Sequence, residues 1–209
     1  MTTWILLRSA GIGAYLMLFL SVSWGLISTT AVVSKRVSKR SANLFHQFTA
    51  NAGLLLLAIH MALLLIDEFM PFAIADLLIP MRSTYRPVAT GLGVVGMYLM
   101  VVILVTSWLR KPIGPAWWRR LHLLSVPAFT VALAHGIFAG SDSGRPWAMA
   151  MYAITGILVL FLVIVRGLTH GYRPPRGERP SRNVSAPPAH EGAPDPAMTA
   201  QAPNVAVSP

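Results

Sequence analysis

The chain has 209 residues, of which 55% are hydrophobic and only 11% are charged. Soluble domains carry about a quarter charged residues, so this composition excludes an ordinary soluble protein and indicates a membrane protein. The chain has no cysteine, which excludes disulfides, thiolate metal sites and cysteine-bound iron–sulfur clusters within it.

The apolar residues fall in blocks long enough to cross a bilayer, which takes about 20 helical residues. The first block is longer than the apolar part of a signal peptide, roughly 7–15 residues, so we expect it to remain as a membrane span. We predict an all-α integral membrane protein, a five-span helical bundle within residues 1–171. The predicted spans cover residues 4–33, 43–66, 87–109, 117–140 and 147–168.

The connecting segments have their own patterns. Between the second and third spans, residues 72–79 are apolar apart from Asp76, which predicts a short helix in the membrane interface. The stretch "RKPIGPAWW" predicts a tight turn after the third span. Residues 172–209 are rich in Pro, Ala, Ser and Arg, and we expect a disordered tail because such a composition cannot offset its ordering entropy.

The net charge of +10 is unevenly distributed along the chain. Basic residues in cytoplasmic loops are the usual determinant of membrane topology. The asymmetry therefore predicts an outer amino terminus and a cytoplasmic tail, and it explains the basic charge without a nucleic-acid partner. Arg82, Arg86 and Arg145 lie in the opposite loops, whereas thirteen basic residues share the predicted cytoplasmic side: Lys35, Arg36, Lys39, Arg40, Arg110, Lys111, Arg119, Arg120, Arg166, Arg173, Arg176, Arg179 and Arg182.

Four of the six histidines lie within predicted spans. His46 and His60 belong to the second span, and His122 and His135 belong to the fourth. These two spans run in the same direction, so the four histidines form two pairs at two matched depths. Fourteen helical residues span about 21 Å and thirteen about 19.5 Å.

The angle about the helix axis between the two histidines of a span differs between the second and the fourth span. At about 100° per residue, His46 and His60 share a face, and Gly53 lies midway between them on that face. A residue without a side chain leaves room there for a bulky flat group. His122 and His135 are about 140° apart in an ideal helix, but Pro127 lies between them and can kink or rewind it.

Neutral imidazole is an axial ligand of haem iron, so two bis-histidine haems are the interpretation that the pattern favours. A zinc site needs three or four ligands at one depth, and a proton relay normally recruits Asp or Glu. Two alternatives stay open: histidines that only bridge helices in a non-redox interaction or structural subunit, and histidines that relay protons.

The stretches "NLFHQFTANAGLLLLAIH", "STYRPVATGLG", "WWRRLHLLSVPAFTVALAHG" and "GSDSG" resemble the ferric reductase-like transmembrane domain family, over about residues 8–166. Relatives in this family include ferric reductases, the membrane domain of NADPH oxidases and the haem-binding subunit of the periplasmic methionine sulfoxide reductase system. The resemblance implies that His46 pairs with His122 on an inner haem b, and that His60 pairs with His135 on an outer one.

The resemblance also implies a transmembrane b-type cytochrome in the cell membrane, an electron-transfer subunit for an oxidoreductase. Because no glycine fingerprint for NAD(P)H is present, we expect a separate flavoprotein or a membrane quinol as donor. The acceptor would be a ferric chelate or an extracytoplasmic redox partner, and flavin binding without a motif is possible. We expect the haem propionates to be held by cations or donors, with Arg119 and Arg120 for the inner haem and Arg8, Arg82, Tyr85 and Arg86 for the outer haem.

Overall fold

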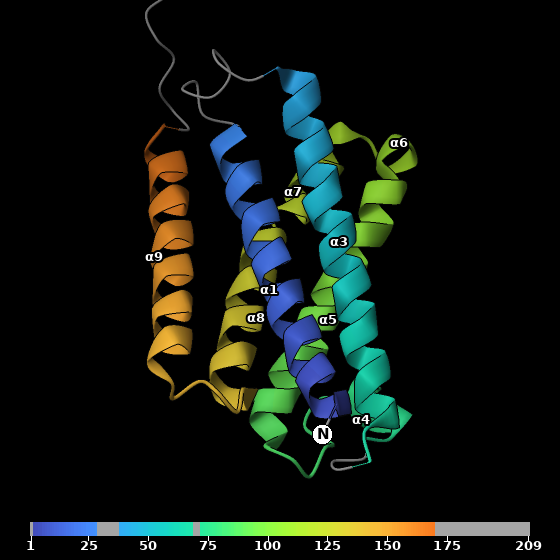
Figure 1. Cartoon of the computed structure of the whole chain (residues 1–209). Helices are drawn as coiled ribbons and strands as arrows, with labels where there is room; N and C mark the ends of the chain where they lie inside the picture. The colour runs from blue at the N-terminus through green and yellow to red at the C-terminus, as the bar shows by residue number, and fades with distance from the viewer. Residues whose placement is uncertain (1, 29–37, 69–71, 170–209) are drawn as a thin grey trace, which may run out of the picture. The chain divides into compact units, whose positions relative to one another are not determined.

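The structure, a computed structural model, describes residues 2–28, 38–68 and 72–169, and this part of the chain contains helices and no strand. Five segments in it are long and apolar enough to cross a membrane, which confirms the predicted five-span all-α fold. The predicted tail, residues 172–209, and the end of the first predicted span lie outside the described residues. The helices are α1 (Thr2–Ser28), α3 (Lys39–Ile66), α4 (Ile74–Leu78), α5 (Pro87–Trp108), α6 (Arg110–Ile113), α7 (Pro115–His122), α8 (Ser125–Ala139) and α9 (Pro146–Thr169) (Figure 1).

The helix ends follow local sequence signals. Ser38 caps α3, because its hydroxyl accepts a hydrogen bond from the backbone N–H of Ser41 at 3.1 Å. Pro87 and Pro115 occupy the first turns of α5 and α7, where proline costs no helical hydrogen bond. Gly114 has a φ of 80° between α6 and α7, a conformation that glycine adopts without strain.

The short segments around the spans are more helical than expected. The short helix predicted within residues 72–79 is present as α4, and the hydroxyl of Tyr98 on α5 donates to the carbonyl of Leu78 at 2.6 Å. The predicted tight turn over "RKPIGPAWW" instead contains α6 and the start of α7, with Gly114 as the reversal point. The helical segment α7 thus begins the fourth span.

The fourth span is broken between His122 and Ser125, as the presence of Pro127 predicted. Proline has no N–H to donate to the carbonyl of Leu123. That carbonyl accepts from Val126 N instead, at 3.2 Å, and Leu124 N donates to Leu121 O at 3.0 Å. These i to i+3 bonds wind the backbone more tightly than an α-helix does, so the rotation between His122 and His135 differs from that in an ideal helix.

The long helices form two packed pairs, α1 with α3 and α5 with α8, and α1 also packs against α8. α3 and α8 run in the same direction, and α1 and α5 run in the opposite one (Figure 1). The helix α9 lies against α1 and α8. Each histidine-bearing helix therefore has an antiparallel partner beside it.

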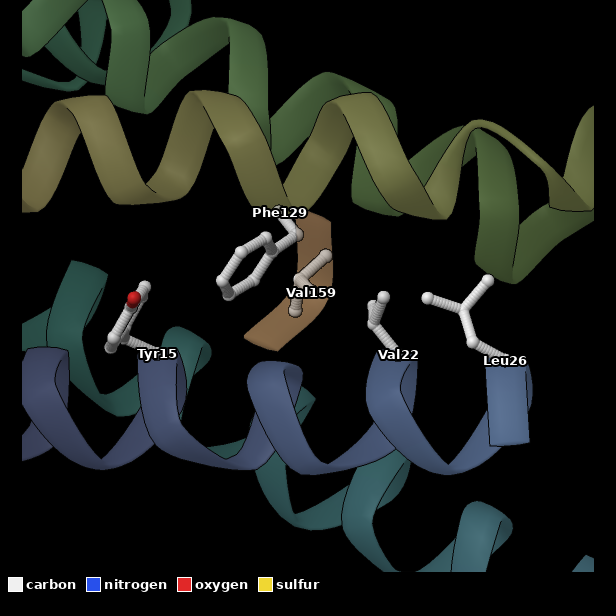
Figure 2. Close-up of a cluster of buried hydrophobic side chains, with 5 residues drawn as sticks. All are labelled: Tyr15, Val22, Leu26, Phe129 and Val159. Atoms are coloured by element: carbon white, nitrogen blue, oxygen red, sulfur yellow. The ribbon is translucent and has the colours of Figure 1, made fainter. Parts of the chain in front are cut away.

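A small apolar cluster holds α1, α8 and α9 together (Figure 2). Tyr15, Val22 and Leu26 project from α1 toward Phe129 of α8 and Val159 of α9. The rings of Tyr15 and Phe129 are stacked, with centroids 5.6 Å apart. Many other large apolar side chains of the described helices are exposed, which fits helices whose outer faces meet lipid.

Candidate functional site

A cavity of about 1250 Å³ runs through the described part of the bundle, and all four span histidines line it. Pockets for single small molecules are usually about 300–1,000 Å³, so this cavity has room for more than one such group. Most of its lining comes from α1, α3, α5, α7 and α8, and α4, α6 and α9 contribute further residues. His46, His60, His122 and His135 therefore all border one interior space.

His46 and His122 face each other at the end of the cavity near α7. Their ring centroids are 6.0 Å apart, with an angle of 74° between the ring planes. Two imidazoles bound to one metal from opposite sides, each through a bond of about 2 Å, have ring centroids about 6 Å apart. The two rings are thus spaced to share one metal ion.

Three of the four histidines are held by backbone carbonyls on the neighbouring helices. The Nδ1–H of His60 donates to Leu7 O of α1 at 3.0 Å, and that of His135 donates to Ala89 O of α5 at 2.8 Å. His46 Nδ1 lies 3.1 Å from Ser21 O and 3.2 Å from Ser21 Oγ. Because a carbonyl can only accept, each ring carries its proton on Nδ1. Each Nε2 is then free as a lone-pair donor to a metal.

A glycine lies beside each of these three rings, four residues after the accepting carbonyl. A Cβ at Gly93 would lie 2.8 Å from His135, and a Cβ at Gly11 would lie 3.0 Å from His60. At Gly25 it would lie 3.7 Å from His46. The missing side chains allow the rings of His60 and His135 to reach the backbone of α1 and α5.

His122 is the exception among the four histidines. Its Nδ1 is buried and has no hydrogen-bond acceptor among the described residues. Its ring stacks instead on Trp118 of the same helix, with centroids 5.1 Å apart and an interplanar angle of 29°. His122 is therefore oriented by packing where the other three are oriented by hydrogen bonds.

The predicted cations at the α7 end border the cavity. Arg119 and Arg120 line it and are exposed, and Arg120 lies over the ring of Trp117 at 5.2 Å. Two further arginines, Arg110 and Arg166, line the cavity as well. Cations of this kind are suited to carboxylates of a bound group.

At the opposite end, the predicted cations already have partners within the protein. Arg8 lines the cavity and forms an ion pair with Asp142, and its guanidinium lies 4.2 Å from the ring centroid of Trp4. Arg86 donates from Nη1 to Phe138 O at 2.7 Å. Tyr85 lines the cavity, and its hydroxyl donates to Ala139 O at 3.5 Å.

The expected partners of an outer group are thus partly engaged elsewhere. Arg82 Nε lies 3.5 Å from Asp76 Oδ1, so this side chain is held by α4. The Arg8–Asp142 pair joins the first helix to the loop between α8 and α9. Arg8 and Tyr85 are the two predicted outer residues that border the cavity.

Gly53 borders the cavity but contacts α1. A Cβ at this position would lie 3.2 Å from Met17 Cβ, 3.6 Å from Leu18 N and 3.7 Å from Ala14 O. The room that we expected Gly53 to leave for a flat group is therefore occupied by α1. The glycine allows α1 and α3 to pack closely.

Sequence reasoning did not find the backbone acceptors of the histidines. The signal that marks them is a spacing: Gly11 and Gly25 are fourteen residues apart, as are His46 and His60. This shared interval puts one glycine of α1 beside each histidine of α3. Asp142, the partner of Arg8, was also not singled out.

The fold and the site together define a multi-pass membrane protein with paired histidines around an internal cavity. Residues 10–133, which are 124 of the 209 residues, match the family described as Ferric reductase like transmembrane component. The chain belongs to this family. The match contains His46, His60 and His122 and ends two residues before His135. A search of curated proteins and a search of solved structures found no match.

Proposed function

We propose that this protein is a transmembrane b-type cytochrome that carries single electrons across the cell membrane through two haems, each held by one histidine pair. The observation that carries the proposal is the set of four imidazoles around one cavity, three of them with Nδ1 bonded to a backbone carbonyl. Membership of the ferric reductase-like family supports an electron-transfer role.

The residues present fit two haems. The ring centroids of His46 and His122 are 6.0 Å apart, so these two residues would hold the iron of one haem between them. His60 and His135 line the same cavity, and because their Nδ1 atoms are bonded to carbonyls, Nε2 is the atom of each ring that would hold the second iron. Arg119 and Arg120 are placed for the propionates of the inner haem, and Arg8 and Tyr85 border the outer end. When bound, the iron supplies a one-electron Fe(III)/Fe(II) couple.

The chain's own residues set the conditions for this chemistry. The backbone acceptors fix the ring orientation of His46, His60 and His135 and strengthen these three imidazoles as ligands. The cavity lining from α1, α3, α5 and α8 is largely small or apolar, with Gln47, Thr49 and Asn51 among its polar members; the apolar majority lowers the local dielectric. The two levels are fourteen residues apart on α3, about 21 Å along the helix.

The loop charges support an assignment of the electron donor and the electron acceptor to opposite sides of the membrane. The predicted cytoplasmic side carries the basic excess, and there we propose a separate flavoprotein or a membrane quinol as electron donor. On the opposite side we propose a ferric chelate or an extracytoplasmic redox protein as acceptor. The protein then serves as the electron-transfer subunit of an oxidoreductase.

A non-redox interaction or structural subunit is the second candidate, because His46, His60 and His135 do bridge helices through Nδ1. A bridging role is satisfied by one hydrogen bond per ring. It does not explain why every ring borders a cavity of about 1250 Å³, or why His46 and His122 face each other at 6.0 Å. The cytochrome accounts for all three observations.

The visible spectrum of the purified protein, expressed with added haem precursor, separates the two candidates. The cytochrome has a Soret band, an α band that appears on reduction with dithionite, and two haems per chain. His60→Ala and His135→Ala should each remove the same outer haem, and His46→Ala and His122→Ala the same inner one. A folded protein without a Soret band, or loss of different haems from the two members of a pair, contradicts the proposal.

A further inference from the structure

The hydrogen-bond acceptors of the histidines follow one repeated arrangement on α1 and α5. In each case residue i supplies the carbonyl and residue i+4 is a glycine: Leu7 and Gly11, Ser21 and Gly25, Ala89 and Gly93. In a helix the carbonyl of residue i points toward residue i+4. A side chain there lies across the path of an approaching ring, so the glycine opens the carbonyl to a second donor.

The fourth place in this arrangement is occupied differently. Fourteen residues after Gly93 on α5, the position corresponding to Gly25 on α1 is Ser107, and the carbonyl four residues before it belongs to Ile103. Ser107 Oγ donates to Ile103 O at 2.7 Å. A carbonyl oxygen has two lone pairs, and in a helix one accepts the N–H of residue i+4. The serine hydroxyl takes the other. Thr106 Oγ1 also lies 3.2 Å from Ile103 O, but its shorter bond, 2.7 Å, goes to Val102 O.

Ser107 also lies next to the ring system that holds His122. Trp118 Nε1 is 3.5 Å from Ser107 Oγ, and Trp118 stacks on His122. The residues Ile103, Ser107, Trp118 and His122 all line the cavity. His122 Nδ1, in turn, is the buried ring nitrogen that has no acceptor among the described residues.

We propose that Ser107 is a positioning residue: its side chain covers the Ile103 carbonyl, so that this carbonyl does not accept a hydrogen bond from His122. The midpoint potential of the inner haem is thereby raised. The inference rests on the proposed function. A ligand imidazole whose N–H is hydrogen-bonded is a stronger base toward the metal, and a stronger ligand stabilises Fe(III). With His122 lacking that bond, the inner haem would hold its electron more tightly than it would if both of its histidine ligands were hydrogen-bonded.

The test compares Ser107→Gly with Ser107→Ala by spectroelectrochemistry of the haem-loaded protein. Both variants remove the hydroxyl and the Trp118 contact, but only glycine also removes the Cβ that covers the Ile103 carbonyl. In Ser107→Gly the His122 Nδ1–H gains an acceptor, and we expect the inner midpoint potential to fall. A tenfold fall in the Fe(II)/Fe(III) ratio at fixed ambient potential corresponds to about 59 mV. Ser107→Ala should stay close to the parent protein.

Gly25→Ser and Gly25→Ala test the converse change, in which a serine is introduced at a position where the structure has space for a side chain. A Cβ there would lie 3.7 Å from His46, an ordinary contact. A serine hydroxyl in a helix bonds to the carbonyl four residues earlier, here Ser21 O. Gly25→Ser should therefore raise the inner potential relative to Gly25→Ala. The rise is expected to be smaller than the fall in Ser107→Gly, because Ser21 Oγ remains 3.2 Å from His46 Nδ1.

The outcomes separate this inference from the proposed function. The inner couple is identified as the one missing from His122→Ala protein. Two haems with equal inner potentials in Ser107→Gly and Ser107→Ala overturn the role of Ser107 and leave the cytochrome intact. A shift of the outer potential alone overturns it too. Absence of haem from the parent protein refutes the proposed function itself. Should Ser107→Gly not fold, the Gly25 pair decides by the sign of its difference.

Discussion

Replacing Gly93 by alanine is a one-methyl perturbation directed at the outer histidine pair. The added Cβ would lie 2.8 Å from His135 Cε1 and 2.9 Å from Nδ1, whereas carbon atoms pack at about 3.5–4.0 Å. The ring must therefore move by about 0.7 Å. Its bond from Nδ1 to Ala89 O is 2.8 Å long, and an extension of about 0.4 Å already reaches the limit of a good hydrogen bond.

Loss of the acceptor behind a metal-bound histidine typically weakens metal binding by about 10–100-fold, or about 1.4–2.8 kcal/mol. We expect Gly93→Ala protein to lose outer haem at concentrations where the parent keeps two haems per chain. Haem per protein, measured as the pyridine haemochrome during stepwise haem addition, gives the affinity.

Gly96→Ala is the matched control for this change. It lies on the same helix, and its Cβ would meet only Val131 Cγ1, at 3.6 Å, so both haems should remain. Both substitutions raise helix propensity by about 0.5–1 kcal/mol, which cancels in the comparison. Equal haem content and equal outer spectra in the two variants would refute the reasoning about close approach.

Three further predictions concern stability and packing, measured by thermal unfolding in detergent. Phe129 is 2% exposed, so Phe129→Ala should lower the free energy of unfolding by about 3 kcal/mol. Phe48 is 68% exposed, so Phe48→Ala should lower it little. Equal losses of stability in the two variants would contradict the packing of Figure 2. Arg8→Met and Asp142→Asn should each destabilise the protein by about 1–3 kcal/mol. Because the two side chains form one ion pair, the double variant should lose less stability than the sum of the two single losses. Strictly additive losses would contradict this. Gly53→Ala should lower the unfolding temperature, costing about 1 kcal/mol through overpacking against α1, while both haems stay bound; selective haem loss would instead favour a cofactor contact at Gly53.

The spans and the histidine levels could be predicted because they depend on residue type and interval alone. Apolar blocks of membrane length define the helices, and the interval from His46 to His60 puts both rings on one face of α3. The break before α8 was also predictable, since Pro127 removes a specific donor. These features need no knowledge of which helix lies beside which.

The supporting contacts could not be predicted because they depend on the neighbouring helix. A carbonyl at Leu7 or Ala89 is chemically the same as every other carbonyl in the chain, so residue type does not mark it as an acceptor. Gly53 and Gly93 look alike in the sequence, but one meets the backbone of α1 and the other meets a histidine ring. Arg8 likewise pairs with a residue 134 positions away in the chain.

The pairing of each histidine helix with an antiparallel acceptor helix has a consequence for biosynthesis. α1 and α3 are adjacent long helices, and both are complete before the ribosome begins α5. Chains generally fold in units from the amino terminus during synthesis, so the carbonyls of Leu7 and Ser21 can orient His60 and His46 while the second half is still being made. The nascent membrane protein would then have one side of its cavity, α1 with α3, already packed. The helices α5 and α8 would complete the cavity once they are synthesised.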